Sequence, residues 1–308
     1  MTRTQIATTT VTNGSASTSY TIPSDTSTGE HDLYAVLEQN NNYETAEGES
    51  TIHIRHSTTI TTNNVVASIG ETVTFTASIK YNTSQNVPDG TVQFMLGGSN
   101  IGSPVTVSNG SASLQYEIPS NTLSGSSIVA KYIQTNDYAA SQSSGNTISI
   151  REDPTVSLQN VSANRSSTAT ITASITDKEG TSIDTGKAVL LIDNTQIGSA
   201  EDVSNGSVSF SYSVASNAVL GSHSIKIVYQ QNQTYNSAFG TASLIVRTPT
   251  TLTPVDVSVN KGGTCSVIIQ VTDNNGSAVT TGTVNITVGN NSPVSANVNS
   301  SGEATITY

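Results

Sequence analysis

The chain has few charged residues and almost none of the residues that build disulfides or metal sites. Its 308 residues include one Cys, no Trp, 11 Lys and Arg, and 22 Asp and Glu, which gives a formal net charge of −11. A single Cys forms no disulfide and no Cys-based zinc site within one chain. The scarcity of Lys and Arg argues against nucleic-acid binding, because neutralising phosphates dominates that affinity. No apolar run is as long as a membrane span requires.

Leucine is also scarce, and β-branched residues are abundant. The sequence has 11 Leu against 54 Ile and Val, together with 47 Thr and 47 Ser. Helical bundles draw on straight-chain residues, whereas Ile, Val and Thr favour sheets. Composition alone leaves disorder open, because few residues are apolar. The order of the residues therefore has to show whether the chain folds or is disordered.

The sequence repeats with a period of 96 residues. Five sets of residues keep this spacing: Tyr20, Tyr116, Tyr212 and Tyr308; Asn13, Asn109 and Asn205; Gly29, Gly125 and Gly221; Gly90, Gly186 and Gly282; and Arg55, Arg151 and Arg247. Such self-similarity indicates a tandem array. We predict complete repeats at 57–152 and 153–248, the C-terminal part of a repeat at 1–56, and the N-terminal part of one at 249–308.

Each repeat has the pattern of short strands. Val73, Phe75, Ala77 and Ile79 alternate with polar residues, and the later repeats alternate at the same positions. A period of two marks a strand with one buried face. About seven such strands in each repeat, with turn signals between them, predict an all-β fold. The expected architecture is a tandem, extended array of Ig-like β-sandwich domains.

Three Asn-Gly pairs lie between strand patterns, which predicts hairpin turns. This dipeptide favours the type I′ turn, because both residues tolerate positive φ. The pairs are Asn13 and Gly14, Asn109 and Gly110, and Asn205 and Gly206. The recurring Tyr residues lie on inward strand positions, where a core role is favoured over stacking on a ligand.

The residues at 109–120, Asn-Gly-Ser-x-Ser-x-x-Tyr-x-Ile-Pro-Ser, resemble the bacterial Ig-like domain family, group 3. Segments 228–237 and 250–254 are similar to the same family, and the likeness extends over the whole chain. It implies display on the cell surface, as in adhesin-like proteins of methanogenic archaea and bacteria. The implied role is adhesion, or a stalk that supports adhesion elsewhere. At 298–302, Val-Asn-Ser-Ser-Gly departs from the Asn-Gly-Ser turn pattern.

Both ends of the chain carry only part of a repeat, and two explanations compete. The favoured one is that the chain is a window within a longer protein, with signal and anchor outside it. The alternative is a filament, in which the incomplete ends of two chains complete one sandwich by head-to-tail self-association.

No set of residues has the spacing of a catalytic or metal site. The four His do not combine with Ser and Asp, and His31 and His223 are interpreted as solvated loop residues. Glu152 and Asp153 flank one repeat boundary, but a calcium site at boundaries should recur, and this pair does not. We therefore expect no enzyme activity, no cofactor and no metal.

The recurring arginines end the last strand pattern of each repeat, so Arg55, Arg151 and Arg247 are candidate hinge residues that set the angle between domains. Several Asn-x-Ser/Thr sequons are candidate glycosylation sites on a secreted protein. The candidates are Asn82, Asn160, Asn164, Asn232 and Asn285.

The favoured function is a non-enzymatic structural or adhesive stalk of a large cell-surface protein, with a host-cell or surface-glycan ligand. One alternative is a carbohydrate-binding module, for which Tyr43, Tyr138 and Tyr235 are the best stacking residues. Another is an accessory module of a secreted enzyme. Neither nucleic-acid binding nor membrane insertion is expected of this region.

Overall fold

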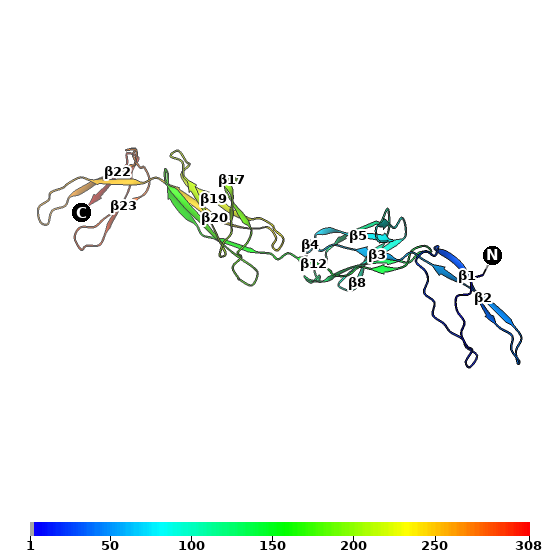
Figure 1. Cartoon of the computed structure of the whole chain (residues 1–308). Coiled ribbons are helices and arrows are strands. Elements are labelled where there is room, and N and C mark those ends of the chain that lie inside the picture. The colour runs from blue at the N-terminus through cyan, green and yellow to red at the C-terminus, as the bar shows by residue number, and fades with distance from the viewer. Residues whose placement is uncertain (1–2) are drawn as a thin grey trace. The chain divides into compact units, whose positions relative to one another are not determined.

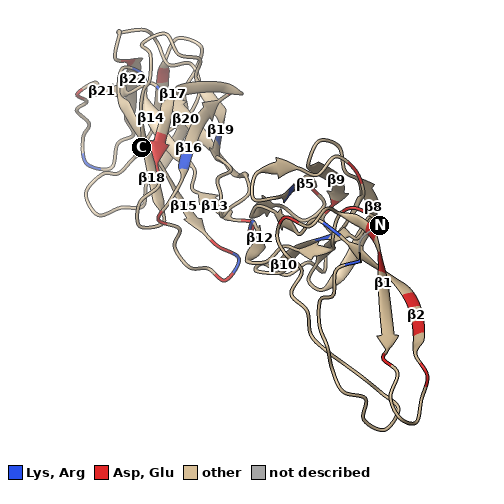
Figure 2. Ribbon diagram, turned by 45° about the vertical axis from the view of Figure 1, so that its right-hand side comes forward, with Lys and Arg blue, Asp and Glu red and all other residues tan. Residues whose placement is uncertain are grey.

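A computed structural model describes residues 3–308, which form 25 strands and no helix (Figure 1). None of the described residues therefore forms a helix that could cross a membrane. The chain divides into two compact units, Met1–Arg151 and Glu152–Tyr308. Charged residues are few and scattered over both units (Figure 2).

The first unit contains twelve strands. They are β1 (Gly29–Leu37), β2 (Ala46–Ile54), β3 (Thr58–Thr61), β4 (Val65–Ala67), β5 (Thr72–Tyr81), β6 (Gln85–Asn86), β7 (Thr91–Leu96), β8 (Ser99–Thr106), β9 (Ser111–Glu117), β10 (Ser127–Ile133), β11 (Ser141–Gln142) and β12 (Asn146–Ile150).

The second unit contains the remaining strands. They are β13 (Thr155–Leu158), β14 (Val161–Asn164), β15 (Thr168–Thr176), β16 (Lys187–Ile192), β17 (Thr195–Asp202), β18 (Ser207–Ser213), β19 (Gly221–Tyr229), β20 (Ala238–Arg247), β21 (Thr250–Pro254), β22 (Ser266–Asp273), β23 (Thr283–Ile286), β24 (Val294–Asn297) and β25 (Glu303–Thr307).

Two sheets enclose a hydrophobic core in the domain built from β3 to β12. One sheet has the order β3-β5-β6, with β9 also paired to β5, and the other has the order β4-β12-β10-β7-β8. Inward side chains of β5 and β7, such as Phe75, Ile79 and Phe94, are at most 1% exposed. Their neighbours on β5 face solvent, as the alternation predicts.

The same sandwich recurs in the second unit. Its sheets are β13-β15-β18 and β14-β20-β19-β16-β17, and β14 runs parallel to β20 as β4 does to β12. A separate core lies between them, with Ile171, Leu190, Ile225 and Tyr229 fully buried. The prediction of an all-β fold made of tandem Ig-like sandwiches is confirmed.

The flanking segments form smaller pieces of the same architecture. Strands β1 and β2 form an antiparallel hairpin, and the described residues before β1 add no strand. After the second sandwich, β21-β22-β25 and β23-β24 form two small sheets. They enclose a small core around Ile269, Val271 and Ile306.

The Asn-Gly pairs adopt positive φ at both residues, the geometry of a type I′ turn. Asn109 has φ 49° and Gly110 has φ 74°, and Ser108 and Ser111 exchange two backbone hydrogen bonds across them. The turn joins strands that do not pair with each other, however. β8 pairs with β7 while β9 pairs with β5, so the chain changes sheets at this turn.

Gly110 is required at this turn because its backbone packs directly against β5. Its N–H donates to the Val87 carbonyl, and its own carbonyl accepts from the Ile79 N–H. A Cβ atom on Gly110 would lie 2.8 Å from the Ile79 carbonyl oxygen. The repeating Asn-Gly therefore joins the two sheets of each sandwich.

Gly110→Ala should destabilise the domain at 58–151 by about 3 kcal/mol, because it adds a backbone clash to the cost of positive φ. Gly125→Ala is the matched control, since Gly125 has φ +84° but nothing within 4 Å of its Cβ position. That variant should lose only about 1 kcal/mol. Calorimetric unfolding of the full chain measures both, and equal losses would contradict the packing role.

Candidate functional site

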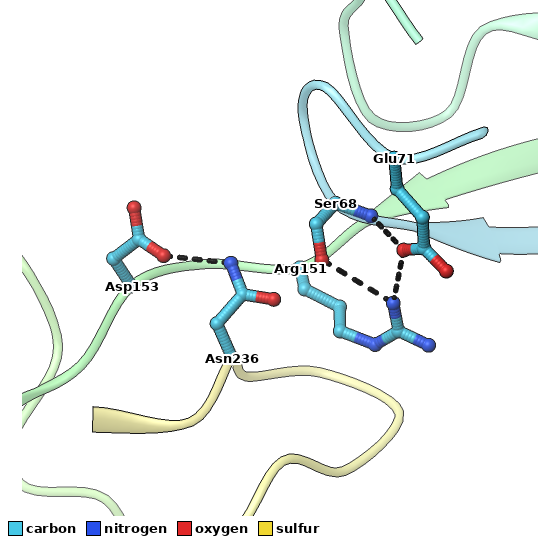
Figure 3. A network of polar contacts seen from close by, with 5 residues as sticks. All are labelled: Ser68, Glu71, Arg151, Asp153 and Asn236. Carbon is cyan, nitrogen blue, oxygen red and sulfur yellow. Dashed lines mark hydrogen bonds and ion pairs between the residues drawn. The ribbon is translucent and has the colours of Figure 1, made fainter. Parts of the chain in front are cut away.

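Arg151, the last residue of the first unit, is held by its own domain. Its backbone N–H donates to the Ala67 carbonyl at 2.8 Å. Its Nη1 donates to Glu71 Oε2 at 2.9 Å and to Ser68 Oγ at 3.3 Å (Figure 3). The Arg151 side chain is 11% exposed, so this ion pair is partly shielded from solvent.

Glu71 is fixed mainly by the turn that carries it. Its Oε2 accepts the Ser68 N–H at 2.8 Å, and this bond is the largest cause of a lowered pKa for the Glu71 carboxyl. Partial burial opposes the lowering, and the positive charge of Arg151 adds to it. The carboxylate therefore closes a turn and binds the end of the last strand.

The three recurring arginines make different contacts. Arg55 Nε donates to the Thr135 carbonyl at 2.8 Å, whereas Arg151 pairs with Glu71. The Arg247 side chain is exposed. Ser167 stands where Glu71 stands one repeat earlier, so Arg247 has no equivalent carboxylate there. Their proposed role as hinge residues stays a prediction.

The residues that follow Arg55 and Arg151 each make the same pair of backbone hydrogen bonds. His56 N–H donates to the Asp137 carbonyl at 2.8 Å, and its carbonyl accepts from the Ala139 N–H at 2.9 Å. One repeat later, Glu152 makes the same two bonds. We call each pair of bonds a linker bridge.

In the second unit, Glu152 N–H donates to the Thr234 carbonyl at 2.9 Å and its carbonyl accepts from the Asn236 N–H at 2.8 Å. The Asn236 side chain also donates to Asp153 Oδ1 at 2.6 Å (Figure 3). Both linker bridges are parallel β-bridges, His56 to Tyr138 and Glu152 to Tyr235. Neither linker bridge requires a particular side chain at the bridging residue, so the sequence carries no signal for them.

The linker bridges cover the aromatic residues that were the best candidates for carbohydrate stacking. Tyr138 is 9% exposed and its ring lies 5.0 Å from Tyr81 and 5.7 Å from His56. Burial is the main cause that raises the pKa of Tyr138 to about 12. Tyr235 is half-buried, and only Tyr43 remains 67% exposed.

An acidic cluster lies beside the second linker bridge. Carboxylate oxygens of Glu152, Asp177 and Glu179 lie within 4.8 Å of one another. In the first unit the equivalent positions hold His56, Tyr81 and Thr83, so the cluster does not recur. Burial is the main cause that raises the pKa of Tyr235, and the negative charge of Glu152 adds to it. Surface carboxylates of this kind repel one another and do not by themselves indicate a bound cation.

The candidate glycosylation residues differ in accessibility. Asn82 is exposed in a turn with φ 44°, and Asn164 is exposed. Asn160 and Asn285 are exposed, and their side-chain oxygens accept hydrogen bonds from Ser243 and Ser295.

Asn232 is the least accessible sequon. Its Nδ2 donates to the Tyr229 hydroxyl at 2.8 Å, and its Oδ1 accepts from two backbone N–H groups of the same loop.

The interpretation of His31 and His223 as loop residues is wrong, because they lie in β1 and β19. His223 Nδ1–H donates to Asp193 Oδ2 at 2.6 Å, and Nε2–H donates to the Val219 carbonyl at 2.8 Å. Two acceptors facing one imidazole favour its protonated form. The hydrogen bond to Asp193 is the main cause that raises the pKa of His223, and it also lowers the pKa of Asp193.

Arg151→Ala should lower the stability of the domain at 58–151 by about 1 kcal/mol, because a partly shielded charged hydrogen bond is lost. The loss of unfolding free energy relative to the unmodified chain should be largest above the ordinary Glu71 pKa of 4.5. It should vanish as pH falls through the lowered pKa of Glu71. Arg247→Ala is the control and should change little. Calorimetry at several pH values tests this, and equal effects of both variants would contradict it.

His223→Gln should change the pH dependence of unfolding in the second unit. The raised His223 pKa stabilises the fold below 6.5, and this is lost as pH rises through the folded pKa. The lowered Asp193 pKa stabilises the fold above 3.8, and this is lost as pH falls. The difference in unfolding free energy between the unmodified chain and the His223→Gln variant should therefore be largest between pH 3.8 and pH 6.5. A difference independent of pH would show that the pair does not titrate with folding.

No curated protein matches the sequence of this chain. Three solved structures are similar to parts of this chain. Fibronectin(III)-like modules of CbhA from Clostridium thermocellum are 18% identical over 61% of this chain and 94% of that chain, with a TM-score of 0.38. A titin I-band fragment is 12% identical over 77% of this chain and 81% of that chain, with a TM-score of 0.44.

The third is a structure of a 1.5-MDa bacterial ice-binding adhesin, 16% identical over 82% of this chain and 87% of that chain, with a TM-score of 0.37. In sequence, residues 58–151 match the family described as bacterial Ig-like domain, group 3. This match confirms, over residues 58–151, the resemblance seen in the sequence.

Proposed function

We propose that this chain is a non-enzymatic structural region, a stalk of Ig-like repeats in a large cell-surface adhesin-like protein. The observation that supports it most is the linker bridge. The N–H of Arg151 is bonded to Ala67 in the first unit, and the N–H of Glu152 is bonded to Thr234 in the second. No residue between these two bonded residues is left to act as a flexible linker.

A linker of this kind suits a spacer. Flexible linkers let domains reorient, because each free residue adds rotatable backbone angles. Here Arg151 and Glu152 are consecutive residues that both make backbone hydrogen bonds, and His56 makes the same linker bridge as Glu152 one repeat earlier. A linker bridge that repeats suits a stalk, because a stalk has to restrict the motion of each domain against the next.

The surface also suits a spacer. Ser and Thr fill the outward strand positions, so the surface is hydrated while carrying few charges. Such a surface produces little long-range field to attract unrelated molecules. Nucleic acid is not a proposed partner, because Lys and Arg are few and dispersed (Figure 2).

An enzymatic role has little support in the described residues. The Ser224 hydroxyl donates to Asp193 Oδ1 at 3.3 Å, and both ring nitrogens of His223 are bonded to other acceptors, so neither is free to take a proton from that hydroxyl. The acidic cluster at Glu152, Asp177 and Glu179 is partly exposed. The proposal therefore places the chain outside the cell, where it displays or contacts a host-cell or glycan ligand. The carbohydrate-module alternative is weakened, because Tyr138 and Tyr235 are covered.

Small-angle scattering of the full chain tests the stalk. The unmodified chain should give a narrow distribution of maximum dimension, and a short Gly-Ser insertion between Arg151 and Glu152 should broaden it. The same insertion between Gly97 and Gly98, in an exposed turn, is the control and should leave the distribution narrow. A distribution that is already broad without the insertion would contradict the proposal.

A further inference from the structure

Asparagine followed by glycine can lose ammonia without an enzyme, because glycine has no Cβ to hinder its backbone nitrogen. The glycine nitrogen gives its proton to a base in the solvent and bonds to the side-chain Cγ of Asn. The bond from Cγ to the side-chain nitrogen breaks, and that nitrogen takes a proton from water and leaves as ammonia. Water then opens the resulting ring to an aspartyl or isoaspartyl residue. The reaction therefore needs a glycine N–H that is open to solvent and a backbone that can move.

Asn109, Asn205 and Asn275 offer the same reacting atoms to this chemistry. Each of them is followed by Gly and then by Ser, so the groups that react and the residue after them are identical. The side chains of all three asparagines are exposed. A difference in reactivity among the three has to come from the way the fold holds the glycine.

The glycines after Asn109 and Asn205 are enclosed by the fold. Gly110 and Gly206 are both buried. The Gly110 N–H donates to the Val87 carbonyl at 2.7 Å, and the Gly206 N–H donates to the Ile183 carbonyl at 3.1 Å. These acceptors lie far away in sequence, so the N–H is freed only when the whole turn leaves the segment against which it packs. Few molecules are in that opened state at any time.

The turn that follows β22 holds its glycine differently. Gly276 is exposed, and nothing lies within 4 Å of its Cβ position. Its N–H donates to the Asp273 carbonyl at 3.0 Å, three residues back in the same turn. Asp273 Oδ1 accepts the N–H groups of Asn275 at 2.8 Å and Ser277 at 2.9 Å. All these bonds are local and lie at the surface, so residues 274–276 can open without separating the strands.

We propose that Asn275 is a site of spontaneous deamidation in the folded protein, and that the turn joining the two sheets keeps Asn109 and Asn205 unreactive. The modification replaces an uncharged amide by a carboxylate and raises the mass by about 1 Da. The Asn-Gly pairs on which the sandwich depends are thus shielded by the packing that requires their glycine. This inference goes beyond the stalk proposal and does not rest on it.

The same turn recurs in the complete second domain, where it carries a carboxylate. Glu179 and Gly180 stand at the positions of Asn275 and Gly276. The Gly180 N–H donates to the Asp177 carbonyl at 3.1 Å, and the Glu179 N–H donates to Asp177 Oδ1 at 3.0 Å. Glu179 and Gly180 are exposed as well. The exposure therefore belongs to the turn itself, and an aspartyl product at 275 is compatible with it.

An isoaspartyl product at 275 differs from the aspartyl one, because its backbone runs through the former side chain and is longer by one atom. The longer backbone moves the N–H groups that Asp273 Oδ1 holds, so this product should loosen the turn. The two products have equal masses and are separated by chromatography of the peptide that contains residue 275.

Peptide mass mapping of the full chain after incubation at mildly alkaline pH tests the proposal, because each asparagine is measured in its own peptide. In denaturant the three residues should convert at similar rates. In the folded chain, conversion at Asn275 should exceed that at Asn109 and Asn205 by ~100-fold or more, because these two react only from an opened turn. Equal rates in the folded chain, or no conversion at Asn275 while the denatured chain converts, would overturn the proposal.

Glu179→Asn supplies a matched variant, because it places the reacting pair in the same turn of the complete second domain. The replaced side chain is exposed and lies in the acidic cluster, so the domain should remain folded. Residue 179 of this variant should convert at a rate close to that of Asn275 in the same sample. Conversion as slow as that of Asn109 would overturn the proposal, because the reactivity would then not belong to the turn.

Discussion

Two backbone hydrogen bonds, made by the residue that follows Arg55 and again by the residue that follows Arg151, are the constraint on which the stalk proposal depends. His56 and Glu152 each donate and accept one bond in the hairpin loop of the domain that follows. The bonds are short parallel β-bridges, so they constrain the backbone itself rather than the tip of a long side chain. The Arg151 N–H donates to the Ala67 carbonyl within the first unit. The stalk proposal rests on this constraint.

The side chains around the linker bridges vary although the bridges do not. His56 packs against Tyr81 and Tyr138, whereas Glu152 lies beside Asp177 and Glu179. One environment is aromatic and the other is acidic at equivalent positions. A backbone contact tolerates such exchange, because its bonds use atoms that every residue except Pro possesses. Each bridge can therefore persist in the array while its surface chemistry changes from repeat to repeat.

This tolerance explains what the sequence could and could not predict. Alternation of Val73, Phe75, Ala77 and Ile79 predicted a half-buried strand, because burial acts on every second side chain. The recurring arginines suggested one shared contact. Arg151 pairs with Glu71, but the residue equivalent to Glu71 in the next repeat is Ser167, so Arg247 has no such carboxylate. The Asn-Gly pairs predicted the turn geometry but not the change of sheet, which depends on long-range pairing. The linker bridges left no side-chain signal at all.

Amide hydrogen exchange at Glu152 tests this account most directly. If the linker bridge holds, the amides of Glu152 and Asn236 exchange slowly, at rates like those of amides within β19 and β20. The amide of Asp153, for which the structure shows no backbone bond, serves as the internal reference and exchanges quickly. Exchange of Glu152 and Asn236 at the rate of an unstructured peptide would contradict the account.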